Sequence, residues 1–120
     1  MISLILIFLS GIFCACMDKL RFHYSKSIFS KWSSQDWVNP SVSWTNKWLP
    51  KSKIGDLLMS TVFVFVTDFW HMCKFIMITL LLLAVVVYNP MVNWYVDLFV
   101  YYCTFTITFE LFFSKVLSLK

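Results

Sequence analysis

The stretch FIMITLLLLAVVVY, residues 75–88, decides the fold because no charged side chain interrupts it. It ends a longer apolar run, 57–88, which would form about 48 Å of helix at about 1.5 Å per residue. The hydrocarbon layer of a bilayer is only about 30 Å thick. Since Asp68, His71 and Lys74 all lie before the uncharged stretch that begins at residue 75, a membrane span is expected over about residues 70–88. Residues 57–69 should project beyond it or lie at the interface.

Two further apolar runs, 1–17 and 94–117, complete the pattern. The first lacks a basic residue before it and a clear small-residue cleavage site, which favours a retained helix over a signal peptide. The Asn-Pro step within residues 89–93 is typical of a turn between two helices. Only 13% of the residues are charged and 60% are hydrophobic, whereas soluble domains carry about 25% charged residues. The sequence therefore predicts an all-α, polytopic membrane helical bundle, a single membrane domain over 1–120 with about three transmembrane helices.

Basic residues gather in the segment 18–56 and in the tail, and the N-terminal run and residues 89–93 carry no Lys or Arg. We expect an integral protein of the bacterial inner membrane, and the positive-inside rule predicts that its N-terminus lies outside and its C-terminus is cytoplasmic. No run of five or six like charges occurs, so a nucleic-acid partner is not expected. The basic residues concerned are Lys19, Arg21, Lys26, Lys31, Lys47, Lys51, Lys53, Lys115 and Lys120.

The segment 18–56 is rich in aromatic residues, which flexible linkers lack. Tryptophan prefers the membrane–water boundary, where its ring is half buried and its N–H stays hydrated. We expect a short interfacial helix over residues 20–32 and turns at Asn39-Pro40 and Leu49-Pro50. An alternative is that the tryptophans form a partner-binding surface. The tryptophans assigned to the interface are Trp32, Trp37, Trp44, Trp48, Trp70 and Trp94.

Five ionisable residues should lie at a similar depth when the three spans alternate in direction: Asp18, His23, Asp68, His71 and Glu110. Asp68 and His71 are three residues apart and would share a helix face. One interpretation is internal pairing, of Lys74 with Asp68 or Glu110 and of Asp18 with Lys19 or Arg21. A second is a divalent metal, since Asp-x-x-His supplies two ligands from one helix. A third is proton relay or contact with lipid headgroups.

Other chemistry has little support in the sequence. The four cysteines lie in apolar stretches and form no C-x-x-C pair, so buried thiols are expected. No phosphate-binding glycine loop and no nucleophile motif occurs, no catalytic residue is identified, and whether the chain is an enzyme stays open.

Three blocks resemble those of a family of small uncharacterised integral membrane proteins of bacteria and phages: MDKLRFHYSKSIFS (17–30), WVNPSVSWTNKW (37–48) and STVFVFVTDFWH (60–71). The resemblance implies that these blocks belong to one unit and brings no assigned activity. One functional hypothesis is a polar, metal-binding site near the cytoplasmic face, acting on a lipid or another membrane-partitioned substrate. The other is a non-enzymatic accessory or oligomeric protein with a partner-binding, channel-like or phage-exclusion role. Expected partners are membrane lipid, a second copy or another membrane protein.

Overall fold

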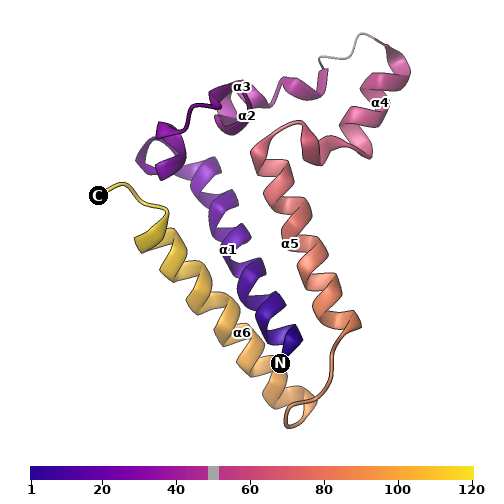
Figure 1. Ribbon diagram of the computed structural model, residues 1–120, viewed down its shortest axis with the longest axis vertical. Helices are drawn as coiled ribbons and strands as arrows, with labels where there is room; N and C mark the ends of the chain where they lie inside the picture. Colours follow the sequence, from indigo (N-terminus) through magenta and orange to yellow (C-terminus); the bar gives the residue numbers. More distant parts are fainter. Residues whose placement is uncertain (49–51) are drawn as a thin grey trace.

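Three long helices lie side by side in the computed structural model, which describes residues 1–48 and 52–120 (Figure 1). They are α1 (Ile2–Phe22), α5 (Phe69–Val86) and α6 (Trp94–Leu111), and a π-helical turn, Phe112–Val116, continues α6. The three segments Ile2–Phe22, Phe69–Val86 and Trp94–Val116 are long and apolar enough to cross a membrane. The prediction of an all-α bundle with three membrane-length helices is confirmed.

Short helices connect α1 to α5 across one end of the bundle (Figure 1). In chain order they are the 3₁₀ turns Tyr24–Lys26 and Ile28–Lys31, α2 (Gln35–Val38), α3 (Pro40–Ser43), the 3₁₀ turn Asn46–Trp48, α4 (Lys53–Thr61) and the 3₁₀ turn Val64–Val66. Asn39 ends α2 and caps α3 by accepting a 3.1 Å hydrogen bond from the Ser41 N–H, as expected for the predicted Asn39-Pro40 turn. The predicted Leu49-Pro50 turn lies outside the described residues.

The predicted interfacial helix over residues 20–32 is wrong. Helix α1 runs on to Phe22, where Lys19 and Arg21 in its last turn suit the negative end of the helix dipole. Beyond it, the Ser27 and Ser30 hydroxyls donate to carbonyls three residues back, at 2.6 and 2.8 Å, which favours 3₁₀ turns. The C-terminal tail also opposes a helix here, because the Ile28 N–H donates to the Leu117 carbonyl at 3.0 Å instead of to a carbonyl within a helix.

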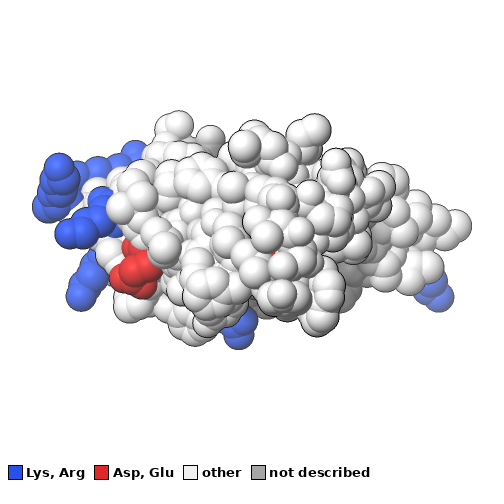
Figure 2. Space-filling model, turned by 90° about the horizontal axis from the view of Figure 1, so that it is seen from below, with Lys and Arg blue, Asp and Glu red and all other residues white. Residues whose placement is uncertain are grey.

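The two ends of the bundle differ in character. The N-terminus and the turn of residues 87–93 lie at one end, which we call the turn end. Residues 23–48, residues 52–68 and the C-terminus lie at the other, which we call the basic end (Figure 1). Seen from the turn end, the molecule is almost entirely uncharged, and the basic side chains appear at its edges (Figure 2).

Asp97, which the sequence analysis did not single out, organises the turn end. It is fully buried in the first turn of α6, where a carboxylate suits the positive end of the helix dipole. It accepts hydrogen bonds from the Met91 N–H (2.9 Å), the Val92 N–H (3.2 Å) and the Tyr88 hydroxyl (2.9 Å). The turn between α5 and α6 is therefore held by a single acidic side chain.

Helix α1 lies between α5 and α6 and packs against both (Figure 1). Small side chains make close approach to α6 feasible, as is common where membrane helices meet. At Gly11 a Cβ atom would lie 3.0 Å from the Phe105 carbonyl oxygen and 3.1 Å from the Thr108 Cβ. The buried small residues of α1 are Ser3, Ser10, Gly11 and Ala15.

We expect Gly11→Ala to lower the thermal stability of the protein in detergent. Alanine gains about 1 kcal/mol of helix propensity over glycine, but here the added methyl meets a backbone oxygen, which can move only if α6 moves. The control is Ile5→Ala on the exposed face of the same helix. Thermal unfolding of both variants checks this, and a Gly11→Ala variant more stable than the wild type would contradict the close α1–α6 contact.

Candidate membrane-interface site

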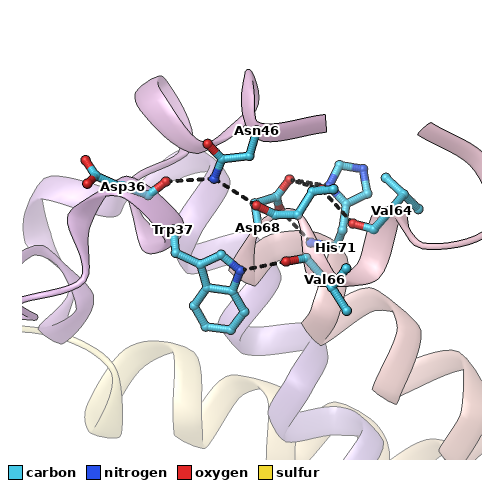
Figure 3. Close-up of polar contacts among 8 residues, drawn as sticks. Asp36, Trp37, Asn46, Val64, Val66, Asp68 and His71 are labelled. Atoms are coloured by element: carbon cyan, nitrogen blue, oxygen red, sulfur yellow. Dashed lines mark hydrogen bonds and ion pairs between the residues drawn. The ribbon is translucent and has the colours of Figure 1, made fainter. Parts of the chain in front are cut away.

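Asp68 begins α5 and is paired with His71 (Figure 3). Its extended backbone places the side chain over the first turn, where Oδ1 accepts the His71 N–H at 2.8 Å. Aspartate is among the preferred residues at this capping position because its oxygen satisfies a backbone donor that has no partner within the helix. The second carboxylate oxygen lies 2.6 Å from Nδ1 of the His71 ring. Asp68 itself is only 3% exposed.

The pairing sets the orientation of the imidazole. A carboxylate accepts only, so a neutral His71 carries its proton on Nδ1 and keeps Nε2 as an acceptor. The imidazole lies beside Asp68 with its other nitrogen turned away from the carboxylate (Figure 3). The His71 side chain is 28% exposed, so this nitrogen can meet a molecule from outside the protein.

Polar contacts from the segment 35–48 hold the chain just before Asp68. The Asn46 amide donates to the carbonyls of Asp36 (2.9 Å) and Thr67 (2.8 Å), and the Trp37 indole donates to the Val66 carbonyl at 3.1 Å (Figure 3). These bonds connect residues 37–48 with residues 60–71, so the approach of the chain to the start of α5 is fixed from both sides.

Aromatic packing supports the same junction. The Phe69 ring is buried, and three rings surround it, those of Phe29 (5.3 Å between centroids), Trp32 (5.6 Å) and Trp37 (5.3 Å). Trp44 and Trp48 are more than half exposed at the basic end, and Trp94 is exposed at the turn end. Of the tryptophans assigned to the interface, Trp32 and Trp37 thus also form part of the packing of the protein itself.

A pocket of about 350 Å³ opens beside the Asp68–His71 pair. Arg21, exposed in the last turn of α1, brings a permanent positive charge to the pocket wall. Trp70 lies edge-on to the His71 ring with centroids 4.9 Å apart. The pocket is lined by Arg21, Pro40, Ser43, Asp68, Trp70 and His71.

The structure brings together two of the five ionisable residues that the sequence placed at one depth. Asp68 and His71 are in contact, but the exposed His23 packs edge-on to the Phe113 ring at 5.5 Å, and Glu110 accepts from the Ser114 hydroxyl. Asp18 is half-buried on α1. In the described part of the chain, no three His, Cys, Asp or Glu side chains are grouped so that they could hold a metal ion. The predicted five-residue cluster is not formed, because equal depth places no constraint on the direction in which each helix presents its side chain.

The predicted pairing of Asp68 with Lys74 is not formed either. Within residues 1–48 and 52–120 the ion pair found is Asp68–His71, and the Lys74 amine lies 5.3 Å from the centre of the Trp70 ring. Six residues separate Asp68 from Lys74, which puts the two side chains on different faces of a 3.6-residue helix.

No protein-family model, curated protein or solved structure that was compared with the chain matches it. The geometry of the site is therefore the basis from which a function is inferred.

We expect Asp68→Ala to destabilise the protein by about 0.5–2 kcal/mol, the usual loss when a capping side chain is removed. Asp68→Asn should cost much less, because asparagine caps helices about as well as aspartate. Chemical or thermal unfolding in detergent measures both. If Asp68→Asn were as damaging as Asp68→Ala, the bond to the His71 ring, and not the cap, would hold the start of α5.

Proposed function

We propose that the chain is a multi-pass inner-membrane protein that binds the phosphate of an anionic lipid headgroup in the pocket beside Asp68 and His71. The observation that carries the proposal is the convergence of Arg21 from α1 and His71 from α5 on one pocket at the basic end. These two residues are fifty positions apart in the sequence, and the pocket is formed where their helices meet.

The side chains suit a phosphate group. The planar guanidinium of Arg21 can hold two phosphate oxygens at once. His71 can add a third donor through Nε2 when its ring is protonated, and it can accept a proton from a headgroup hydroxyl when its ring is neutral. The Asp68 carboxylate also lies at the pocket, but both of its oxygens are engaged by His71. When the His71 ring is protonated, its charge balances that of the Asp68 carboxylate. The guanidinium of Arg21 then gives the pocket a net positive charge.

The surroundings of the pocket also favour a lipid. Lys26 and Lys31 are exposed on the turns that follow α1, at the same end. Basic residues next to a span are attracted to the anionic cytoplasmic leaflet by about 1 kcal/mol each. The exposed Trp44 and Trp48 rings suit the headgroup region. We accordingly place the basic end in the cytoplasmic leaflet, with the N-terminus and the 87–93 turn outside.

Two other interpretations explain less. A role for the Asp68–His71 pair as a helix cap alone would not explain why the His71 ring is partly exposed or why Arg21 lines the same pocket. A divalent metal needs more donors than Asp68 and His71 supply, and no third His, Cys, Asp or Glu of the described chain joins them. A phosphate needs cationic donors, and the pocket has them.

We expect Arg21→Gln to weaken the binding of phosphatidylglycerol by about tenfold, because a hydrogen bond to a charged group contributes about 1.5–3 kcal/mol. The measurement is titration of the detergent-solubilised protein with short-chain phosphatidylglycerol, followed by native mass spectrometry. Phosphatidylcholine and water-soluble glycerophosphate serve as comparison ligands. His71→Gln should also weaken binding, because it removes the ring nitrogen that the pocket wall presents to the phosphate.

The matched control is Lys26→Gln, which removes one exposed charge at the same end without touching the pocket. If Lys26→Gln and Arg21→Gln weakened binding equally, attraction would be diffuse and the pocket would not be the site. Glycerophosphate binding as strong as phosphatidylglycerol binding would assign the pocket to a soluble phosphate and not to a lipid.

The orientation has its own test. A green fluorescent protein fused after Lys120 should fluoresce in the bacterial cytoplasm, and an alkaline phosphatase fused at the same place should be inactive. A fusion to the 87–93 turn should give the opposite pair of results. An active phosphatase at the C-terminus would invert the assignment of the leaflets.

A further inference from the structure

Glu110 is a carboxylate on the outward face of a membrane-length helix. It lies in the segment Trp94–Val116 and is exposed. Six residues separate it from Val116, so it sits about 9 Å from the end of the span at 1.5 Å per residue. Ionisable residues inside a membrane almost always face the bundle interior, a water-filled cavity or a partner, because exposure to hydrocarbon is unfavourable by several kcal/mol. Its outward position therefore requires an explanation.

No cation of residues 1–48 and 52–120 lies within ion-pair distance of Glu110. The ion pair found in these residues joins Asp68 to His71, and Glu110 accepts a hydrogen bond from the Ser114 hydroxyl on the next turn. A lipid does not supply the missing cation, since acyl chains carry no charge or hydrogen-bond donor and headgroups lie beyond the end of the span.

The surroundings of Glu110 form a recess of about 450 Å³ on the outside of α6. Polar residues recur every fourth position, at Thr106, Glu110 and Ser114, and so lie along one face. Ile107 and Leu111, which are 67% and 50% exposed, lie beside them. The recess is lined by Thr106, Ile107, Glu110, Leu111, Ser114 and Lys115.

The missing cation is present on the same surface. Lys115 is exposed and lines the recess with Glu110, five residues further along the chain. Two copies of the chain insert in the same direction, so their α6 helices run parallel. In parallel coiled coils the residue at heptad position g of one helix pairs with the residue at position e of the other, which is five positions further along the chain, and opposite charges there select the partner. Glu110 and Lys115 have this spacing. Two copies of the recess can therefore pair, because the acidic side chain of each copy meets the basic side chain of the other.

We propose that this recess is a self-association surface, in which α6 packs against α6 of a second copy and Glu110 of each copy pairs with Lys115 of the other. The two-fold symmetry creates two such ion pairs per dimer. Ile107 and Leu111 supply the apolar contact between them, and Thr106 and Ser114 are small enough to let the helices approach.

The experiment measures the monomer–dimer equilibrium of the full chain by energy transfer between labelled copies in phosphatidylcholine vesicles. This zwitterionic lipid carries no net charge and so leaves out the anionic headgroup proposed to bind at the Arg21 pocket. Wild-type protein should dimerise. E110K and K115E should each raise the dissociation constant by about tenfold or more, since polar contacts between membrane helices contribute about 1–2 kcal/mol. The control is K120E, which makes the same charge change outside the recess.

The decisive sample mixes E110K copies with K115E copies. The E110K copy then carries lysine at positions 110 and 115, and the K115E copy carries glutamate at both, so each of the two contacts joins opposite charges. Mixed dimers should therefore form, while each variant alone stays monomeric. If E110K inserts poorly, E110Q replaces it in the single-variant arm and should also weaken dimers. A wild-type chain that is monomeric, an E110K chain that dimerises normally, or a mixture that stays monomeric would each overturn the proposal. So would a wild-type chain that is monomeric alone but retains another membrane protein through Glu110.

Discussion

The hydrogen bonds at the start of α5 decide where the spanning part of the chain begins. The apolar run from residue 57 onward is longer than a bilayer is thick, and hydropathy alone does not divide it. Asp68 divides it, because its carboxylate satisfies the His71 N–H at the point where α5 starts. Once α5 starts at Phe69, residues 53–66 leave the bundle as α4 and a 3₁₀ turn (Figure 1). The pocket at the basic end follows from the same choice, since it opens where α5 begins.

Helix α1 provides the second constraint, because it is packed against both other spans. Gly11 closely approaches α6, while Ala15 and Cys16 belong to the buried cluster that also contains Cys73 of α5. At the basic end even Lys19 is buried, and its amine lies 4.2 Å from the centre of the Phe113 ring. A cation over an aromatic face keeps a favourable electrostatic contact when water is removed. Arg21, two residues later, is exposed and lines the pocket instead.

The sequence predicted the spans well because their signal is long and redundant. A run of uncharged residues and the Asn-Pro turn each locate α5 and α6 independently. Its failure over residues 20–32 has a different origin, since the serine hydroxyls and the Ile28–Leu117 backbone bond compete with helix formation there. Tertiary pairing with the tail of the chain leaves no mark on local sequence.

Only part of the candidate site could be predicted, because some of its contacts follow from spacing along one helix and others depend on tertiary packing. Asp68 and His71 lie on one helix three residues apart, so their contact follows from helical geometry. Asp18, His23 and Glu110 are on other elements, and their direction depends on how each helix is rotated, which neither depth nor spacing specifies. Asp97 escaped notice because its role, holding three donors of the turn, exists only once α5 and α6 have folded back on each other.

The two polar features proposed to bind partners are compatible with one another because they lie on different sides of the molecule. The pocket is built from the ends of α1, α3 and α5, the recess from α6 and its π-helical turn, and they share no residue. Helix α1 stands between α5 and α6 (Figure 1). A dimer formed through α6 would therefore leave both Arg21 pockets open to the surrounding lipid. In these proposals the ionisable residues that the sequence placed at one depth differ in direction: His71 would face a bound ligand and Glu110 a second copy. In a membrane, where an unpartnered charge is unfavourable, the direction in which each such group points is the most informative property that the fold adds to the sequence.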